Sequence, residues 1–329
     1  MLIICGARPG VKTGGAAAGG RDDVMAPVPD RLKGSIPPLI TPFRDGAVDY
    51  DTYGRLLEMQ ITQGSHGVLV NGTTAEPASL TVEERNRLVT FAIEVVRGRV
   101  PVVAATGSQS LAETKALTDH AAKAGADALL IVTPYYSRPP QRGMVQYYLE
   151  VMRGHATPWM IYHIPGRAAI NVTIDTVKAL KDQSPNFVGM KHASPDLDFV
   201  SECFAAVGHD FRIFVGLEDL SFPMMAVGAC GLMNAVGNIR PGPLAEMCEA
   251  VWRGDLKTAR DLHHRLHEIN KAVFYDTNPI PMKYMAKRLG IIPANEHRLP
   301  MVPATPELEK RLDGVLARAG LLSGLRVAE

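Results

Sequence analysis

Short apolar runs rich in β-branched residues alternate with longer amphipathic segments from residue 34 onward. The runs have the length of buried strands, and the segments between them repeat apolar residues with the period of a helix. The pattern predicts strands over residues 36–40, 67–70, 100–104, 128–132, 159–162, 187–191, 212–215 and 231–234. It predicts helices over residues 51–63, 82–97, 110–124, 142–154, 174–181, 197–207, 220–227 and 243–253. Thr81 and Glu84 form a capping box that marks the start of the second helix.

Strands that alternate with helices in this way are joined by right-handed crossovers, which give either an open doubly wound sheet or a closed barrel. Eight such units over roughly 220 residues favour the α/β class with a single (β/α)8 TIM barrel. We expect a catalytic barrel over residues 32–254 and a C-terminal helical extension over 255–321, with helices at 256–275, 282–289 and 306–319. The extension should pack beside the barrel or at a subunit contact.

The two ends of the chain lack the alternation of strands and helices that predicts the barrel. Residues 6–31 are rich in Gly, Ala and Pro and show neither a helical nor a strand period. We therefore expect flexible tails at 1–31 and 322–329, and Met25 is an alternative start of translation.

Charge and cysteine content narrow the class of function. The 329 residues include 35 Lys and Arg against 34 Asp and Glu, and no basic cluster typical of nucleic-acid or membrane binders occurs. Four cysteines without a C-x-x-C spacing fit a reducing compartment, and no apolar run approaches the length of a membrane span. We expect a cytoplasmic protein whose partner is a small molecule.

Lys191 is the most informative candidate for chemistry. It ends the apolar run 187–191, and catalytic groups of TIM barrels gather at the C-terminal ends of the strands. Burial lowers the pKa of an amine, and a neutral amine can form an imine with a carbonyl compound. Judged on the strand alone, the sequence favours the alternative, a lysine that extends to solvent or pairs with a loop carboxylate.

Hydroxyl groups are expected to surround this lysine. Tyr162 ends the neighbouring strand, and by strand alternation its phenol faces the barrel interior and can pass a proton. Thr73 and Thr74 follow the second strand and can bind a carboxylate, and Tyr136 can extend a hydrogen-bonded relay. An ordinary strand-to-helix turn at the threonines and simple surface packing of Tyr136 are the alternatives.

Five segments together resemble, in order and spacing, the dihydrodipicolinate synthase and N-acetylneuraminate lyase family, and the synthases most closely. The segments are Gly72-Thr73-Thr74-Ala75-Glu76, Tyr135-Tyr136-Ser137-Arg138-Pro139, Tyr162-His163-Ile164-Pro165-Gly166-Arg167, Gly189-Met190-Lys191 and Asn278-Pro279-Ile280-Pro281. The resemblance covers residues 33–321 and implies a TIM barrel whose lysine forms a Schiff base with pyruvate, without a metal or cofactor.

The resemblance also implies a role for each residue. Lys191 would form the imine, and Tyr162, with Thr74 and Tyr136, would move protons. Thr73 and Thr74 would hold the pyruvate carboxylate, and the Met233 backbone would lie beside it. Tyr136 would reach into a neighbouring subunit, so a homodimer or tetramer is expected.

Arg167 points to the second substrate. A guanidinium binds a carboxylate in bidentate fashion, and the synthases of this family carry an arginine at this position. Condensation of pyruvate with aspartate semialdehyde is therefore expected, and a 2-oxo-3-deoxy acid aldolase or dehydratase of the same family is the alternative. From other classes, a non-catalytic barrel that binds a small acid and a phosphosugar or flavin barrel remain open.

Some residues depart from the pattern of the synthases and leave the aldehyde open. They are Ala75, Pro77, Ala168, His192 and Glu218. Val82 and Arg85 also differ from the lysine-sensitive members, so the sequence does not favour feedback inhibition by lysine. His163 and His192 should point away from the barrel axis and contact each other in a structural role.

Overall fold

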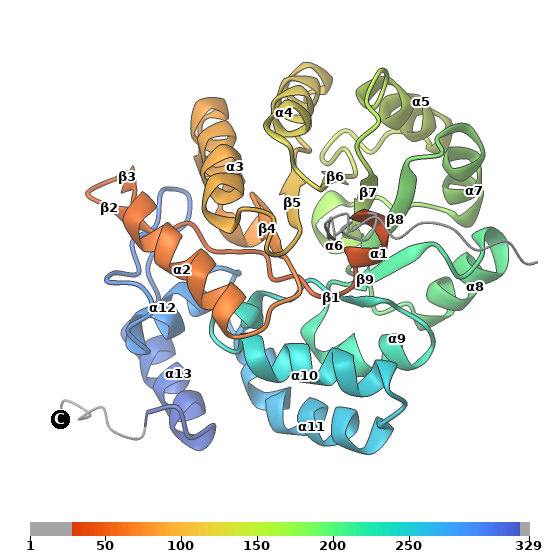
Figure 1. Ribbon diagram of the computed structural model, residues 1–329. Helices are drawn as coiled ribbons and strands as arrows, with labels where there is room; N and C mark the ends of the chain where they lie inside the picture. Colours follow the sequence, from red (N-terminus) through yellow and green to blue (C-terminus); the bar gives the residue numbers. More distant parts are fainter. Residues whose placement is uncertain (1–27, 323–329) are drawn as a thin grey trace, which may run out of the picture.

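The barrel of parallel strands is the centre of the molecule (Figure 1), and the computed structural model describes residues 28–322. The strands follow the order β1, β10, β9, β8, β7, β6, β5, β4 in one sheet. They are β1 (Gly34–Ser35), β4 (Val68–Val70), β5 (Val102–Ala105), β6 (Ala128–Val132), β7 (Trp159–His163), β8 (Phe187–His192), β9 (Arg212–Val215) and β10 (Gly231–Leu232). Pro38 pairs in parallel with Leu69, and the amide of Leu69 donates to the carbonyl of Pro37 at 2.9 Å. The segment after β1 thereby meets β4, which confirms the predicted TIM barrel.

Helices surround the strands as a ring (Figure 1). The ring consists of α2 (Tyr50–Thr62), α3 (Val82–Val96), α4 (Leu111–Ala124), α5 (Gln141–Val151), α7 (Ile174–Gln183), α8 (Leu197–Val207), α9 (Ser221–Ala226) and α10 (Pro241–Trp252). The capping box at the start of α3 is present, since the Thr81 side chain accepts from the amide of Glu84 and Glu84 accepts from the amide of Thr81. Among the described residues, no helix has the length and apolar character needed to span a membrane.

The structure corrects the predicted boundaries at the start of the barrel. The first strand was expected at 36–40, but the ladder pairs Gly34–Ser35, since Pro37 and Pro38 have no N–H to donate. A short hairpin of β2 (Phe43–Arg44) and β3 (Ala47–Val48) was not predicted. Its two turn residues, Asp45 and Gly46, both have positive φ, as a two-residue Asp-Gly turn requires.

Other differences are small. The helix expected at 220–227 begins as a 3-10 turn, η3 (Glu218–Leu220), before α9, and a short helix, α6 (Pro165–Ala168), follows β7. The strand expected at 231–234 ends at Leu232, because the chain turns into η4 (Ala235–Asn238). The expected tails lie outside the described residues, with two exceptions. Residues 28–31 form the short helix α1 (Val28–Arg31), and Leu322 is described and buried.

Strand alternation divides the core into two layers. Met160 and Tyr162 of β7 belong to the cluster inside the barrel, whereas Trp159 and Ile161 pack outward against the helices. The inner cluster comprises Leu32, Ile36, Leu69, Val103, Ala105, Ala128, Leu130, Met160, Tyr162, Ala193, Phe214 and Met233. The phenol of Tyr162 is therefore held on the inner face by the same alternation that buries its neighbours.

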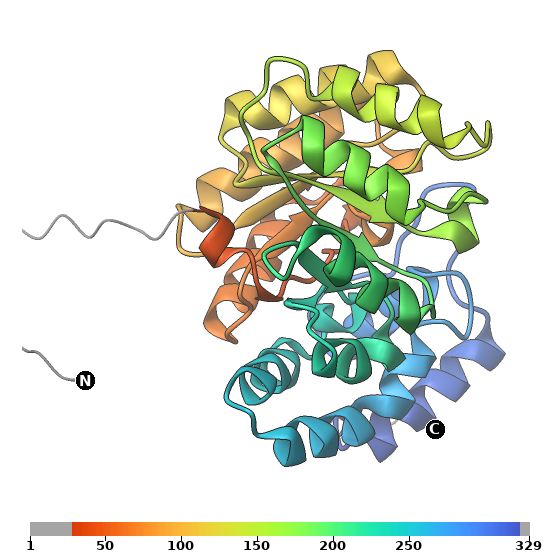
Figure 2. The same ribbon diagram turned by 90° about the vertical axis from the view of Figure 1, so that its right-hand side faces the viewer.

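The C-terminal extension consists of α11 (Leu256–Ala272), α12 (Ile280–Arg288) and α13 (Pro306–Arg318), which lie together on one side of the barrel (Figure 2). The predicted stripe of Leu262, Leu266 and Ile269 on α11 is buried. The prediction that these helices pack beside the barrel is confirmed.

A buried ion pair connects the extension to the loop after β4. Lys283 of α12 places its Nζ 2.6 Å from Oε1 of Glu76, and neither side chain has measurable solvent access beyond 1%. His297 Nδ1 lies 3.1 Å from the same oxygen, and Lys283 also donates to the carbonyl of Glu296 at 2.7 Å. Burial raises the pKa of Glu76, but His297 and Lys283 outweigh burial and hold it below its usual range. Glu76 is thus ionised, and His297 and Lys283 offset the cost of burying its negative charge.

We predict that Lys283→Met destabilises the protein by about 3 to 5 kcal/mol, because it leaves the carboxylate of Glu76 buried without its main partner. Urea titration measures the free energy of unfolding. The control is Lys257→Met, which breaks the exposed ion pair with Asp261 and should cost less than about 1 kcal/mol. Equal losses in the two variants would contradict the assigned role of the buried pair.

Candidate active site

Lys191 and Tyr162 lie side by side inside the barrel because β7 and β8 pair in register. Tyr162 is the direct neighbour of Lys191 in the parallel ladder. Lys191 is 3% exposed, and its Nζ lies 4.5 Å from the centre of the Tyr162 ring. The lysine therefore neither extends to solvent nor pairs with a surface loop, and its amine faces a phenol.

The amine opens into a small cavity of about 50 Å³. Every predicted site residue except Tyr136 lines it: Lys191, Tyr162, Thr73, Thr74, Arg167 and Met233. A wider cavity of about 700 Å³ shares Thr73, Tyr162 and Arg167 with the small one, so the two adjoin. The arrangement is a narrow reactive compartment with a larger entrance.

The loop after β4 places two hydroxyls beside the phenol. Thr73 donates from its Oγ1 to the Tyr162 hydroxyl at 3.3 Å. The Thr74 hydroxyl is buried and accepts from the Asn278 side-chain amide at 2.9 Å, and the Asn278 carbonyl accepts from Arg167 at 3.4 Å. The segment between α11 and α12 thus joins the threonine loop and Arg167 to one another.

Gly216, which follows β9, leaves the space that the Lys191 side chain occupies. A Cβ at Gly216 would lie 2.8 Å from Cβ of Ala193 and 3.0 Å from Cε of Lys191. Contacts that short require the neighbouring atoms to move. The conformation of the lysine therefore depends on a glycine at this position.

Known proteins resemble this chain over most of its length. The profile of the Dihydrodipicolinate synthetase family matches residues 31–319. A 4-hydroxy-tetrahydrodipicolinate synthase of Thermus thermophilus is 46% identical over 292 residues, which are 88% of this chain and 97% of the relative.

The chain belongs to the dihydrodipicolinate synthetase family.

Solved structures of the family share the fold. The dihydrodipicolinate synthase of Aquifex aeolicus has a TM-score of 0.86 at 38% identity, covering 88% of this chain and 99% of its own. The chloride-inhibited synthase of Acinetobacter baumannii, solved in complex with pyruvate, has a TM-score of 0.85 at 32% identity, covering 88% of this chain and 99% of its own. The resemblance inferred from the sequence motifs is confirmed.

Tyr136 is the one predicted site residue that lies away from the cavity. Its side chain is 89% exposed and its backbone has a φ of 70°. The preceding residue, Tyr135, does line the wider cavity. Within one chain, the Tyr162 hydroxyl accepts its hydrogen bond from Thr73 and not from Tyr136.

His163 and His192 form the next pair of β7 and β8 after Tyr162 and Lys191. Their Nδ1 atoms lie 3.2 Å apart, as predicted, and the ring of His192 stacks on Phe199 of α8. His192 Nε2 lies 3.0 Å from the carbonyl of Asp196, and the amide of Val172 donates to Nε2 of His163. The contact with Asp196 fits a proton on His192 Nε2, and His163 Nε2 also lies 3.3 Å from Oδ1 of Asn171. Burial, aided by His192, lowers the pKa of His163 to about 4, so both rings remain neutral at neutral pH.

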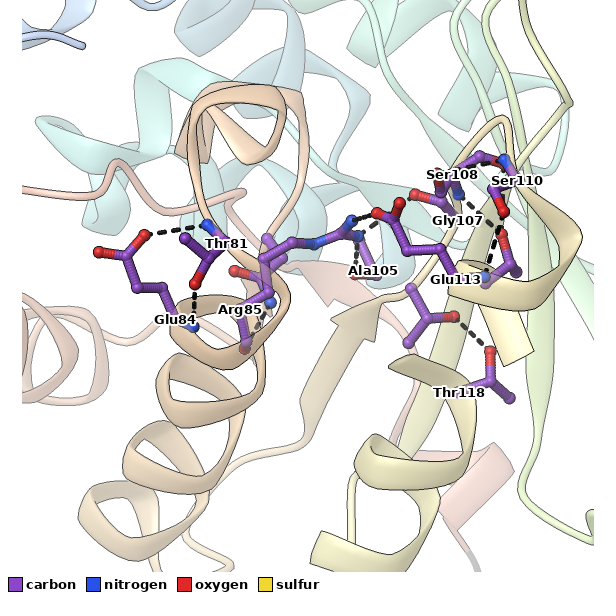
Figure 3. A network of polar contacts seen from close by, with 12 residues as sticks. Thr81, Glu84, Arg85, Ala105, Gly107, Ser108, Ser110, Glu113 and Thr118 are labelled. Atoms are coloured by element: carbon purple, nitrogen blue, oxygen red, sulfur yellow. Dashed lines mark hydrogen bonds and ion pairs between the residues drawn. The ribbon is translucent and has the colours of Figure 1, made fainter. Parts of the chain in front are cut away.

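Arg85 forms part of the wall of the wider cavity. Figure 3 shows its guanidinium pointing from α3 toward Glu113. The guanidinium is buried, lies 3.3 Å from the Glu113 carboxylate and donates to the carbonyls of Ala105 and Gly107 at 3.3 and 3.2 Å. Burial lowers its pKa, and Glu113 opposes this effect. The positive charge of Arg85 is thus compensated by Glu113 and by two backbone carbonyls of the same cavity wall. The lack of feedback inhibition by lysine that the sequence suggests at this position stays a prediction.

Several residues that shape the site were not assigned from the sequence. Asn278 lies in one of the five segments that resemble the family but was given no role, Gly216 was given no role either, and Glu218 was named only as a departure from the pattern of the synthases. An arginine on the apolar side of α3, among Leu88 and Val89, is a signal that could have identified Arg85 as a buried group. Within residues 28–322, no cluster of three or more His, Cys, Asp or Glu side chains is arranged to hold a metal ion.

We predict that Gly216→Ala lowers the rate at which Lys191 reacts with pyruvate by about 10²-fold, because the new methyl group displaces the lysine side chain. Rapid quenching with borohydride followed by intact mass measures this rate. Gly166→Ala is the matched control, since a Cβ at Gly166 meets no atom within 4 Å and should leave the rate unchanged. A rate for Gly216→Ala equal to that of the control would show that the lysine does not need this space.

Proposed function

We propose that the protein is a 4-hydroxy-tetrahydrodipicolinate synthase, a class I lyase that condenses pyruvate with aspartate semialdehyde. The observation that carries the proposal is the buried Lys191 amine beside the Tyr162 ring in a cavity lined by hydroxyls. The Thermus relative bears this name, and the Acinetobacter structure of the family holds pyruvate.

Lys191 supplies the nucleophile in this proposal. Its Nζ attacks C2 of pyruvate, the oxygen leaves as water with two protons, and a protonated imine remains. The imine draws electrons from C3, so a C3 proton can leave and an enamine forms. The enamine carbon then bonds to the aldehyde carbon of the second substrate, whose oxygen takes up a proton.

Tyr162 is proposed to carry protons to and from the pyruvate-derived atoms. Its hydroxyl already accepts a hydrogen bond from Thr73, so a proton can be exchanged within the loop after β4. Thr73 and Thr74 are proposed to bind the pyruvate carboxylate together with the Met233 backbone, since all three line the compartment of Lys191. This assignment needs no metal and no cofactor.

Arg167 is proposed to bind the carboxylate of aspartate semialdehyde. It lies on the exposed helix α6 at the junction of the two cavities and is oriented by the Asn278 carbonyl. A guanidinium at the entrance can hold the distal carboxylate while the aldehyde reaches the enamine.

Tyr136 is proposed to complete the proton relay of a second copy of the chain, together with Thr74. Its exposure leaves a phenol on the surface, where a partner can bury it. A homodimer or homotetramer then contains complete sites. We also propose a cytoplasmic location, since Cys203, Cys230 and Cys248 are unpaired thiols.

We predict that borohydride reduction in the presence of pyruvate attaches the three-carbon acid covalently to Lys191. Intact mass detects the adduct, and peptide mapping assigns its position. Lys181→Met is a control that removes another lysine, one that lies outside the barrel interior at the end of α7, and it should retain the adduct. Absence of an adduct in the native protein would leave only a barrel that binds a small acid, without this chemistry.

We predict that Arg167→Ala lowers kcat/KM for aspartate semialdehyde by about 10- to 100-fold, the effect of losing a charged hydrogen bond. Formation of the pyruvate adduct should stay unchanged, because Arg167 contacts the second substrate only. Arg142→Ala, on α5, removes an equal charge away from the cavities and serves as the control. Equal impairment of both steps in Arg167→Ala would overturn the role given to this arginine.

A further inference from the structure

Glu218 is a buried carboxyl group in the compartment of Lys191. It begins the 3-10 turn η3, two residues after Gly216, and it is 2% exposed. Its side chain lines the same cavity of about 50 Å³ as Lys191, Thr73 and Thr74. An acid in this place is not explained by the proposed reaction, in which the lysine and the hydroxyls act.

The fold fixes the position of this carboxyl group. Oε1 accepts from the amide of Ala235 at 2.6 Å, and the Glu218 carbonyl accepts from the Asn270 side chain of α11 at 3.2 Å. Oε2 is buried and has no hydrogen-bond partner among the described residues. Glu218 is thus rigidly held with one oxygen free in the cavity wall.

The surroundings of Glu218 keep its ionisation close to neutral pH. Burial raises its pKa to about 7, although the amide of Ala235 and the charge of Lys191 act in the opposite direction. Lys191 and Tyr162 face it from β8 and β7, and Arg167 lies at the mouth of the cavity. Asp219 and Lys271 pair with each other at 2.6 Å on the outer side, where His263 of α11 also lies near Asp219.

The number of charges that so small a compartment can hold is limited. The protonated imine of Lys191 carries one positive charge, which a single anion can balance, and a second buried anion would remain uncompensated at high cost. Before substrate binds, Glu218 is the carboxyl group that lines this compartment together with Lys191, and the charge of Lys191 favours its ionised form. A bound 2-oxo acid brings its own carboxylate to Thr73 and Thr74 and competes for the same cation.

We propose that Glu218 takes up a proton when a 2-oxo acid forms its imine with Lys191, so that the substrate carboxylate replaces Glu218 as the counter-charge of the lysine nitrogen. The inference rests on the proposed function and adds a charge-balancing residue to it. The charge on the nitrogen is conserved when the ammonium form of Lys191 becomes a protonated imine. Its two lost protons leave with the ketone oxygen as water, and the proton on Glu218 comes from solvent.

The sign of the pH effect follows from this exchange. Free Glu218 ionises near pH 7, whereas the bound substrate raises its pKa further. Proton uptake therefore occurs above pH 7, and the affinity for pyruvate falls as the pH rises through this range. One pH unit above the free pKa, the expected loss of affinity is about tenfold.

Infrared difference spectroscopy of the native protein tests the proposal directly. Adding pyruvate labelled with ¹³C at C2 at pH 8 should produce a new carboxylic-acid band that shifts in D₂O, because Glu218 becomes protonated. The band should be absent from Glu218→Gln, in which the side-chain oxygen can still accept from Ala235. It should persist in the control Asp219→Asn, which removes the neighbouring surface acid.

Pyruvate affinity provides the second measurement. Glu218→Gln should bind pyruvate at pH 8 about as tightly as the native protein does at pH 6, an improvement of about tenfold over the native protein at pH 8. A purely structural role of Glu218 would predict weaker binding at every pH. An adduct on Lys191 in the native protein without the acid band would overturn the inference and leave the proposed function intact, whereas failure to form an adduct would contradict the proposed function itself.

Discussion

The in-register pairing of β7 with β8 is the constraint on which the site depends. It places Tyr162 and Lys191 at the same level of the barrel, and strand alternation turns both toward the interior. The hydrogen-bonded rings of His163 and His192, one residue further along each strand, connect the same two strands on the outer face. A slip of one residue in this pairing would turn the side chains of one strand to the opposite face and separate Tyr162 from Lys191.

A second set of contacts makes the C-terminal extension part of the site. Asn278 reaches Thr74 and Arg167, and five residues later Lys283 holds Glu76, which belongs to the same loop as Thr74. The helices beyond the barrel therefore help to determine where the loop with Thr73 and Thr74 lies. The family's match to the chain includes this extension, since it continues through residue 319.

Local pattern was sufficient to predict the barrel, the capping box of α3 and the inward orientation of Tyr162 and Lys191, because each follows from periodicity within one element. The environment of Glu218 could not be predicted in this way, since η3, η4 and α11 meet around it from distant parts of the chain. Tyr136 is a different case, because its proposed role depends on a second copy of the chain. The periodicity within one chain gives no information about contacts between copies. The short β1 shows a local error, in which apolar character outweighed the missing amides of Pro37 and Pro38.

The central claim is that an amine enclosed in the barrel reacts with a ketone beside a phenol. A crystal structure of the protein soaked with pyruvate tests it most directly. The account predicts continuous electron density from Nζ of Lys191 to C2 of the ligand, with the ligand carboxylate at Thr73 and Thr74 and the Tyr162 hydroxyl within hydrogen-bond distance of the new bond. Pyruvate bound elsewhere, or bound in this compartment with its ketone oxygen intact and the lysine nitrogen turned away, would contradict it.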